Sequence, residues 1–473
     1  MGMVEYFDDA RWLILQLPRV FSYLYSEGNR RGMLLGTQRV NEQGHLEVGG
    51  CDTLALAQEF GTPLYIMDEA LVRESCRRFV KVFTERYSGE VEVSYAGKAF
   101  LTMAMAKLVD QEGLALDVAS GGELYTALKA GFPAEKILYH GNFKSSEELE
   151  LGVEVGVGRF VVDNPYELQR LAELAAARGK RQAILLRVTP GIDPHTHAKI
   201  STGQEDSKFG ISVASGLALQ TVKEALALPS IDFKGIHCHI GSQLLDSHTH
   251  EDAAEIMVGF IAAIREATGF VCSELDIGGG LGVRYLPSHN PPSYEEFADS
   301  VVGAVVGALK QHDLPLPRLM LEPGRALVAE AGTTLYTVGP IKTIELAERT
   351  KTFVSVDGGL SDNPRPVMYG AEYSVLVAGR AEQAKDKTVT VSGKHCETDL
   401  LFSEIGLGEV HSGDILAVQT TGAYNFGMAS NYNRFRRPAV VFVQNGQADL
   451  VWERESYDDL LRQERLPQRF LEG

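Results

Sequence analysis

Eight short apolar runs, rich in β-branched residues, follow one another through the middle of this 473-residue chain. Most are separated by roughly 10 to 20 residues whose apolar positions recur with helical spacing. Alternating strands and helices predict parallel strands joined by right-handed crossovers. Eight such units within about 240 residues fit a closed (β/α)8 barrel better than an open sheet. The runs are 91–96, 114–119, 136–140, 159–163, 183–188, 234–240, 273–278 and 318–322.

The pattern changes after residue 330, where β-rich segments follow one another with few helical patterns between them. Asn445 and Gly446 separate the last two of these segments, which is typical of a tight hairpin. We therefore expect an α/β fold, a TIM-like barrel plus a C-terminal antiparallel β domain. The predicted division is an N-terminal extension (1–32), a segment joining the β domain (33–66), the barrel (67–330) and the β domain (331–473).

The net charge of −18 disfavours nucleic acid or an anionic membrane surface as the main partner. Five cysteines without a CxxC pair argue against a disulfide framework, so a reducing cytoplasm is expected. No run of apolar residues is long enough to span a membrane. The apolar stretch 12–25 is interpreted as part of the extension rather than a signal peptide, with Met33 as an alternative start.

Polar, ionisable and glycine residues follow each of the eight runs, so they should gather at one rim of the barrel, where barrel enzymes place their sites. Lys98 lies two positions after the first run. A desolvated lysine can form a Schiff base with a carbonyl substrate or with pyridoxal phosphate. The glycine run 278–282 offers backbone N–H groups to a phosphate, and Glu322 offers an acid to a pyridine nitrogen.

Histidine pairs leave a second interpretation open. His237 and His239 alternate along a predicted strand and would share one face, as metal ligands do in barrel hydrolases. His195 and His197 could add ligands to such a site, and His248 with His250 is a third pair of this kind. The alternatives are core histidines or a ring stacked on a planar cofactor.

Many dispersed motifs, taken in order, resemble the fold-type III pyridoxal-phosphate-dependent amino-acid decarboxylases, which share the alanine racemase-like fold. Among them the chain is most similar to the diaminopimelate decarboxylases, over about residues 33 to 465. The motifs are YAGKAF, LDVASGGEL, HGNFKS, DSKFGI, GIHCHIGSQL, LDIGGGLGV, EPGRALVAEAG, VDGGLSDNPRPVMYGA, HCETD and GAYNFGMASNYN.

The resemblance implies decarboxylation of meso-2,6-diaminopimelate to L-lysine and CO2, the last step of lysine biosynthesis, by a cytoplasmic homodimer with shared active sites. Lys98 would carry pyridoxal 5'-phosphate, and His239 would stack on its ring. Cys396, from the neighbouring chain, would be the proton donor after CO2 leaves. The expected cofactor-binding residues are Lys98, His239, Ser242, Gly279, Gly280, Glu322, Gly324, Arg325 and Tyr424. The expected substrate-binding residues are Arg325, Arg365, Tyr369, Glu397 and Tyr424, and no metal is expected.

The sequence departs from the family pattern at Phe143, Thr398 and Asn425, where Asn, Ser and Gly are usual. The first two changes could alter the pocket wall or the loop supplied by the partner chain, and so affect fine specificity more than the type of reaction. Three alternatives remain. They are a decarboxylase for another diamino acid such as ornithine, arginine or carboxynorspermidine, a catalytically inactive homologue that binds a partner, and a metal-dependent hydrolase.

Overall fold

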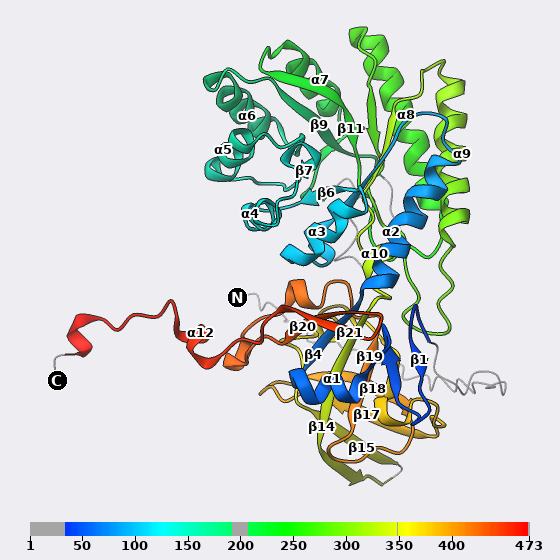
Figure 1. The fold of residues 1–473 in the computed structure, drawn as a ribbon. Coiled ribbons are helices and arrows are strands. Elements are labelled where there is room, and N and C mark those ends of the chain that lie inside the picture. The colour runs from blue at the N-terminus through cyan, green and yellow to red at the C-terminus, as the bar shows by residue number, and fades with distance from the viewer. Residues whose placement is uncertain (1–33, 192–206, 348, 472–473) are drawn as a thin grey trace, which may run out of the picture.

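The computed structural model describes residues 34–191, 207–347 and 349–471, so the predicted N-terminal extension lies outside the described residues. Eight parallel strands close into a barrel, because β8 at one end of the strand order also pairs with β9. Figure 1 shows this barrel above a separate β domain. The barrel strands are β5 (Val91–Ala96), β6 (Ala115–Val118), β7 (Ile137–Tyr139), β8 (Arg159–Val162), β9 (Gln182–Thr189), β11 (Ile231–His237), β12 (Glu274–Asp276) and β13 (Arg318–Leu321).

The helices around the barrel begin where polar caps are available. Asn164 caps α6 by accepting a hydrogen bond from the backbone of Glu167, and Ser293 forms a reciprocal capping box with Glu296 at the start of α9. The apolar faces of these helices pack on the barrel, as the strand–helix alternation predicted. The helices are α2 (Glu69–Thr84), α3 (Met103–Gln111), α4 (Gly121–Lys129), α5 (Ser146–Val155), α6 (Pro165–Ala177), α7 (Leu217–Ala227), α8 (His248–Thr268), α9 (Tyr294–Gln311) and the short α10 (Arg325–Val328).

The β domain is built on a large mixed sheet in the order β18-β17-β15-β14-β4-β20-β21, with β19 pairing both β14 and β16. Most neighbours are antiparallel, but β15 with β17 and β20 with β4 are parallel. Its strands are β4 (Leu64–Asp68), β14 (Gly332–Glu345), β15 (Thr350–Val356), β16 (Val375–Val377), β17 (Lys387–Ser392), β18 (Leu400–Leu407), β19 (Ile415–Gln419), β20 (Ala439–Gln444) and β21 (Gln447–Trp452).

Smaller elements complete the molecule. Near the N-terminal end of the described chain, β1 (Arg39–Val40), β2 (Leu46–Val48) and β3 (Cys51–Asp52) form a three-stranded sheet that leads into α1 (Thr53–Phe60). The described residues also form the short helices α11 (Arg365–Tyr369) and α12 (Tyr457–Leu461) and several 3-10 turns, among them η2 (Gly97–Ala99). The strand β10 (Ile211–Ser212) extends the barrel sheet beside β9. None of the helices among these described residues is long and apolar enough to cross a membrane.

Two details of the sequence prediction can be compared with the structure. The hairpin at Asn445 and Gly446 is confirmed, since both residues have positive φ between β20 and β21. The predicted strand 234–240 is displaced, because β11 starts at Ile231 and ends at His237. His239 therefore follows the strand, and the two histidines do not alternate on one strand as expected.

Candidate active site

A cavity of about 350 Å³ lies between the carboxyl ends of the barrel strands and the β domain. Its barrel side holds Lys98, His239, Ser242, Tyr285 and Arg325, and its other side holds Arg365, Tyr369 and Tyr424. A narrower extension of the cavity is lined by Gly280, Glu322 and Gly324 as well as by Lys98. Two parts of the chain that are remote in sequence thus meet at one site. The rim predicted from the strand pattern included only residues of the barrel.

Lys98 stands in the turn η2 immediately after β5, and its side chain reaches into the cavity. Burial among protein groups lowers the pKa of Lys98, but Asp117 and then Tyr424 and Glu322 outweigh this effect. The pKa of the ammonium therefore lies above its ordinary value. The negative charges of Asp117 and Glu322 thus favour the protonated form of Lys98.

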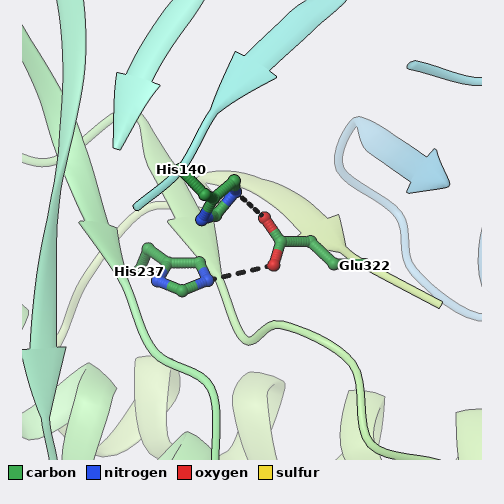
Figure 2. Close-up of side chains that lie close together, drawn as sticks. All are labelled: His140, His237 and Glu322. Atoms are coloured by element: carbon green, nitrogen blue, oxygen red, sulfur yellow. Dashed lines mark hydrogen bonds and ion pairs between the residues drawn. The ribbon is translucent and has the colours of Figure 1, made fainter. Parts of the chain in front are cut away.

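Glu322, directly after β13, is clamped by two imidazoles (Figure 2). One carboxylate oxygen, Oε1, is 2.7 Å from His140 Nε2, and the other, Oε2, is 3.1 Å from His237 Nε2. Burial on its own raises the pKa of Glu322, but the two histidines reverse the effect and hold the pKa well below its usual range. Glu322 is therefore a buried carboxylate that stays ionised.

His140 was not predicted as a site residue. It comes directly after β7, so its position at a strand end, in the run HGN, was the available signal. Its ring centroid is 4.9 Å from that of His237, and its side chain is almost completely buried. The set His140, His237 and Glu322 has three ligand atoms within 4.8 Å of one another, which is the kind of geometry that could hold a metal ion.

The histidine pairs considered for a metal are not brought together as expected. His248 is exposed at the start of α8, while His250 lies close to the backbone carbonyl of Gly279. His195 and His197 lie outside the described residues. His239 lines the cavity next to Lys98, and its Nδ1 accepts a hydrogen bond from the backbone of Gly279. Burial, followed by the charges of Lys98 and Arg187, lowers the pKa of His239 well below its ordinary value, so the ring is neutral.

The glycine-rich turns beside Lys98 pack so closely against neighbouring atoms that a side chain would not fit. A Cβ on Gly279 would lie 2.1 Å from the carbonyl oxygen of Glu322, and Gly280 has a φ of +128° that disfavours other residues. A Cβ on Gly324 would be 3.0 Å from the Cβ of Ala96. These backbones approach one another and the cavity closely, which fits the cradling of a phosphate by N–H groups.

The guanidinium of Arg325 lies at the junction of this cradle with the wider cavity. Its Nε and Nη2 donate to Ser242 Oγ at 3.2 and 3.0 Å, and its carbon lies 4.8 Å from the ring centroid of Tyr424. The guanidinium of Arg365, at the start of α11, donates from Nη1 to the hydroxyls of Tyr285 at 2.9 Å and Tyr373 at 2.8 Å. Both arginines are buried, so two permanent cations face one end of the cavity.

Tyr285 and Tyr373 were not predicted as site residues. Tyr285 follows the glycine run 278–282 by three residues, and that proximity was its only sequence signal. Tyr373 donates to Asn425 Oδ1 at 3.4 Å, so the unusual Asn425 is a buried support of the arginine pair. Phe143, in contrast, is 73% exposed and does not line the cavity.

Cys396 and Glu397 do not line the cavity of their own chain. Both are exposed on the loop before β18, next to Thr398, and the loop is anchored by His395, whose Nδ1 is 2.6 Å from Asp399 Oδ2. The backbone N–H of Cys396 donates to Asn433, and Glu397 is in contact with the hydroxyl of Tyr432. The loop thus presents both side chains outward.

Comparisons with known proteins identify the family of the chain. A family model described as pyridoxal-dependent decarboxylase, pyridoxal binding domain, matches residues 69–329. Diaminopimelate decarboxylase of Bacillus subtilis is 47% identical over 430 residues, covering 91% of this chain and 97% of that protein. The Mycobacterium tuberculosis protein of the same name is 42% identical over 429 residues, covering 89% and 95%.

A solved structure gives the same result for the fold. Diaminopimelate decarboxylase from M. jannaschii, in co-complex with L-lysine, matches with a TM-score of 0.85 and 35% sequence identity, covering 92% of this chain and all of that one. The family model alone spans more than half of the chain. Together with the relatives, it establishes that this chain belongs to the pyridoxal-dependent decarboxylases and, among them, to the diaminopimelate decarboxylase family.

Proposed function

We propose that this cavity removes CO2 from meso-2,6-diaminopimelate and releases L-lysine. The observation that carries the proposal is that one cavity holds both a lysine–carboxylate pair and two buried arginines. Lys98 and the ionised Glu322 line the narrow inner part, Arg365 lines the wider outer part, and Arg325 borders both parts. The substrate matches this arrangement, because one of its amino-acid ends reacts while the other keeps its carboxylate.

The residues at the inner end fit pyridoxal phosphate. When bound, this cofactor supplies a ring that accepts the electron pair left by the departing CO2. Lys98 would hold it covalently, and His239 would lie against its ring. Glu322, kept ionised by His140 and His237, would hold a proton at the pyridine nitrogen.

Its phosphate would be held by the cradle already described. The expected groups are Ser242 Oγ, the backbones of Gly279, Gly280, Gly324 and Arg325, and the hydroxyl of Tyr424. Support comes from the close approach of these glycine backbones to their neighbours, which leaves no space for side chains. Ser242 Oγ already accepts from the Arg325 guanidinium, so its own proton is available to an anion.

The outer end fits the part of the substrate that does not react. Buried guanidiniums bind carboxylates by strong charge-assisted hydrogen bonds, so Arg325 and Arg365 would hold the distal carboxylate, with Tyr369 and Tyr424 beside it. The distal ammonium needs an anion. Glu397 of the partner subunit would supply it.

We also propose that the active unit is a homodimer with shared sites, in the cytoplasm. Cys396 of the partner subunit would protonate the carbon that has lost CO2. Support comes from the position of the loop that carries Cys396, which is exposed and away from its own cavity. The Cys396 thiol would therefore serve the cavity of the neighbouring subunit and not the cavity of its own chain.

A substrate panel tests the reaction. The holoenzyme is incubated with carboxyl-labelled meso-diaminopimelate, ornithine, arginine and carboxynorspermidine, and the released CO2 is measured. We expect release from diaminopimelate at least about 100-fold faster than from the others, since a buried arginine pair left without its carboxylate is costly. Equal or faster release from a diamine-forming substrate would reject the substrate assignment. A protein that takes up no cofactor would be an inactive homologue.

Subunit mixing tests the shared site. Lys98→Ala and Cys396→Ala are each inactive on their own in this account, but a mixed dimer contains one site with both Lys98 and Cys396 intact. Random mixing should restore about a quarter of the wild-type activity, because half of the dimers are mixed and each has one of two sites. No restoration in dimers shown to exchange subunits would mean that Cys396 serves its own chain or none.

A further inference from the structure

The hydroxyl of Tyr285 lies between the two buried arginines. Tyr285 follows β12 in the chain and is 4% exposed. Its oxygen accepts from Arg365 Nη1 at 2.9 Å and also from Arg325 Nη1. Its ring packs edge-on against Tyr373, with centroids 5.3 Å apart. One phenol therefore connects the residue that borders the phosphate cradle with the residue at the outer end of the cavity.

Among the described residues, the hydroxyl of Tyr285 has donors around it but no acceptor for its own proton. A guanidinium has no acceptor, and a phenol oxygen offers two lone pairs and one proton. The two arginines occupy both lone pairs. Within residues 34–191, 207–347 and 349–471 the Tyr285 hydroxyl makes no hydrogen bond as a donor, although it lines the cavity. Tyr373 differs, because it accepts from Arg365 and donates to Asn425.

The charges around Tyr285 make its proton a strong donor. Burial raises the pKa of the phenol, but the guanidiniums of Arg325 and Arg365 outweigh this and lower it below its ordinary value. An acidic phenol forms a stronger hydrogen bond to an anion. A carboxylate that enters this end of the cavity would supply the missing acceptor and would balance two buried cations at the same time.

We propose that Tyr285 binds the distal carboxylate of the substrate, donating a hydrogen bond to it while holding Arg325 and Arg365 on either side. This inference rests on the proposed function and deepens it, since it adds a specificity-determining residue to the outer end of the cavity. It also explains why two like charges are stable side by side before a ligand enters, because both donate to one oxygen.

Two product-like ligands isolate this contact. L-lysine keeps the distal carboxylate, and cadaverine is the same diamine without it. In the Tyr285→Phe holoenzyme we expect L-lysine to bind about tenfold more weakly or worse, while cadaverine changes by no more than about twofold, as measured by calorimetry. In turnover assays the KM for diaminopimelate should rise more than kcat falls. Unchanged lysine binding, or an equal loss for both ligands, would overturn the proposal.

Tyr87→Phe is a matched control. Tyr87 is also buried, and its hydroxyl donates to the carbonyl of Pro317 at 2.7 Å, before β13 and at the opposite end of that strand from the cavity. It should lose a similar amount of stability without a change in the ratio of the two affinities. If Tyr285→Phe does not fold, 3-fluorotyrosine at position 285 keeps the shape and makes the phenol more acidic. At slightly acid pH it should favour L-lysine over cadaverine more than the natural enzyme does, and an unchanged ratio would overturn the proposal.

The wild-type holoenzyme separates this inference from the reaction on which it rests. Wild-type protein that neither releases CO2 from diaminopimelate nor binds L-lysine would reject the proposed function, and Tyr285 with it. Wild-type protein that does both, with a Tyr285→Phe variant that behaves identically, would reject the role of Tyr285 alone.

Discussion

Glu322 in the barrel and Asp362 in the β domain are both buried carboxyl groups, yet their pKa values move in opposite directions. Two imidazoles outweigh burial at Glu322 and hold its pKa well below the usual range. Burial dominates at Asp362 and raises its pKa to about 7, although Tyr336 and the backbone of Gly359 donate to it. Burial thus shifts the pKa of a carboxyl group towards neutral pH, whereas the two imidazoles keep Glu322 ionised where a cofactor nitrogen would need the charge.

Removing the charge at the clamped position should have the largest effect. Glu322→Gln keeps the size of the side chain but cannot hold a proton at a pyridine nitrogen. We expect kcat for diaminopimelate to fall by about 10² to 10³-fold, on the scale of other preorganised electrostatic contacts. Steady-state CO2 release measures the change, and Glu295→Gln, at a partly exposed glutamate paired with Arg78, serves as the control. A loss of less than about threefold would show that the ionised state of Glu322 is not needed.

Removing one half of the clamp should have a smaller effect. His140→Leu leaves the Oε1 oxygen of Glu322 without its nearest imidazole in a buried site, which costs about 1–3 kcal/mol. We expect kcat to fall by about tenfold and the pH at which the cofactor band changes to shift, because Glu322 is then more easily protonated. His45→Leu, in the β domain, is a control that should leave the absorbance titration unchanged.

The pH dependence of stability tests the raised pKa of Asp362. The carboxyl of Asp362 titrates near 3.8 when unfolded and near about 7 when folded, so the folded state binds the proton between these values. Wild-type stability relative to Asp362→Asn should therefore fall as the pH rises from about 4 to about 7. The slope should not exceed about 1.4 kcal/mol per pH unit. Urea unfolding at several pH values measures it, and a difference that rises with pH would contradict a neutral Asp362.

The smallest effect is expected from a substitution at Phe143, three residues after His140. Phe143 departs from the family pattern but is 73% exposed, so Phe143→Asn should change stability by less than about 0.5 kcal/mol and leave kcat nearly unchanged. Thermal unfolding and CO2 release are sufficient to test this. A marked change in either would show that Phe143 contacts a partner or a substrate.

The same comparison explains what could be predicted from the sequence. Lys98, Glu322 and the glycine run each follow a barrel strand, so the alternation of strands and helices was enough to place them at one rim. His140 follows a strand in the same way, but a single histidine gave no reason to pair it with a residue 182 positions away. Its role required the closure of the barrel.

The end of the cavity that is lined by arginines and tyrosines was harder to predict, because two parts of the chain contribute to it. Tyr285 and Arg325 come from the barrel, whereas Arg365 and Tyr373 come from the β domain. No periodic pattern links such segments, and Arg365 was expected only through the family resemblance. The short strand β16 and the irregular β18 show a related difficulty, since their pairing depends on neighbouring strands rather than on their own sequence pattern.

The most direct measurement is the site of cofactor attachment. The protein is reconstituted with pyridoxal phosphate, reduced with borohydride and digested, and the modified lysine is identified by mass spectrometry. We expect one modified peptide, carrying the label on Lys98, and no labelling in Lys98→Ala. The label on another lysine, such as the buried Lys144 that pairs with Glu167, would contradict the proposed active site.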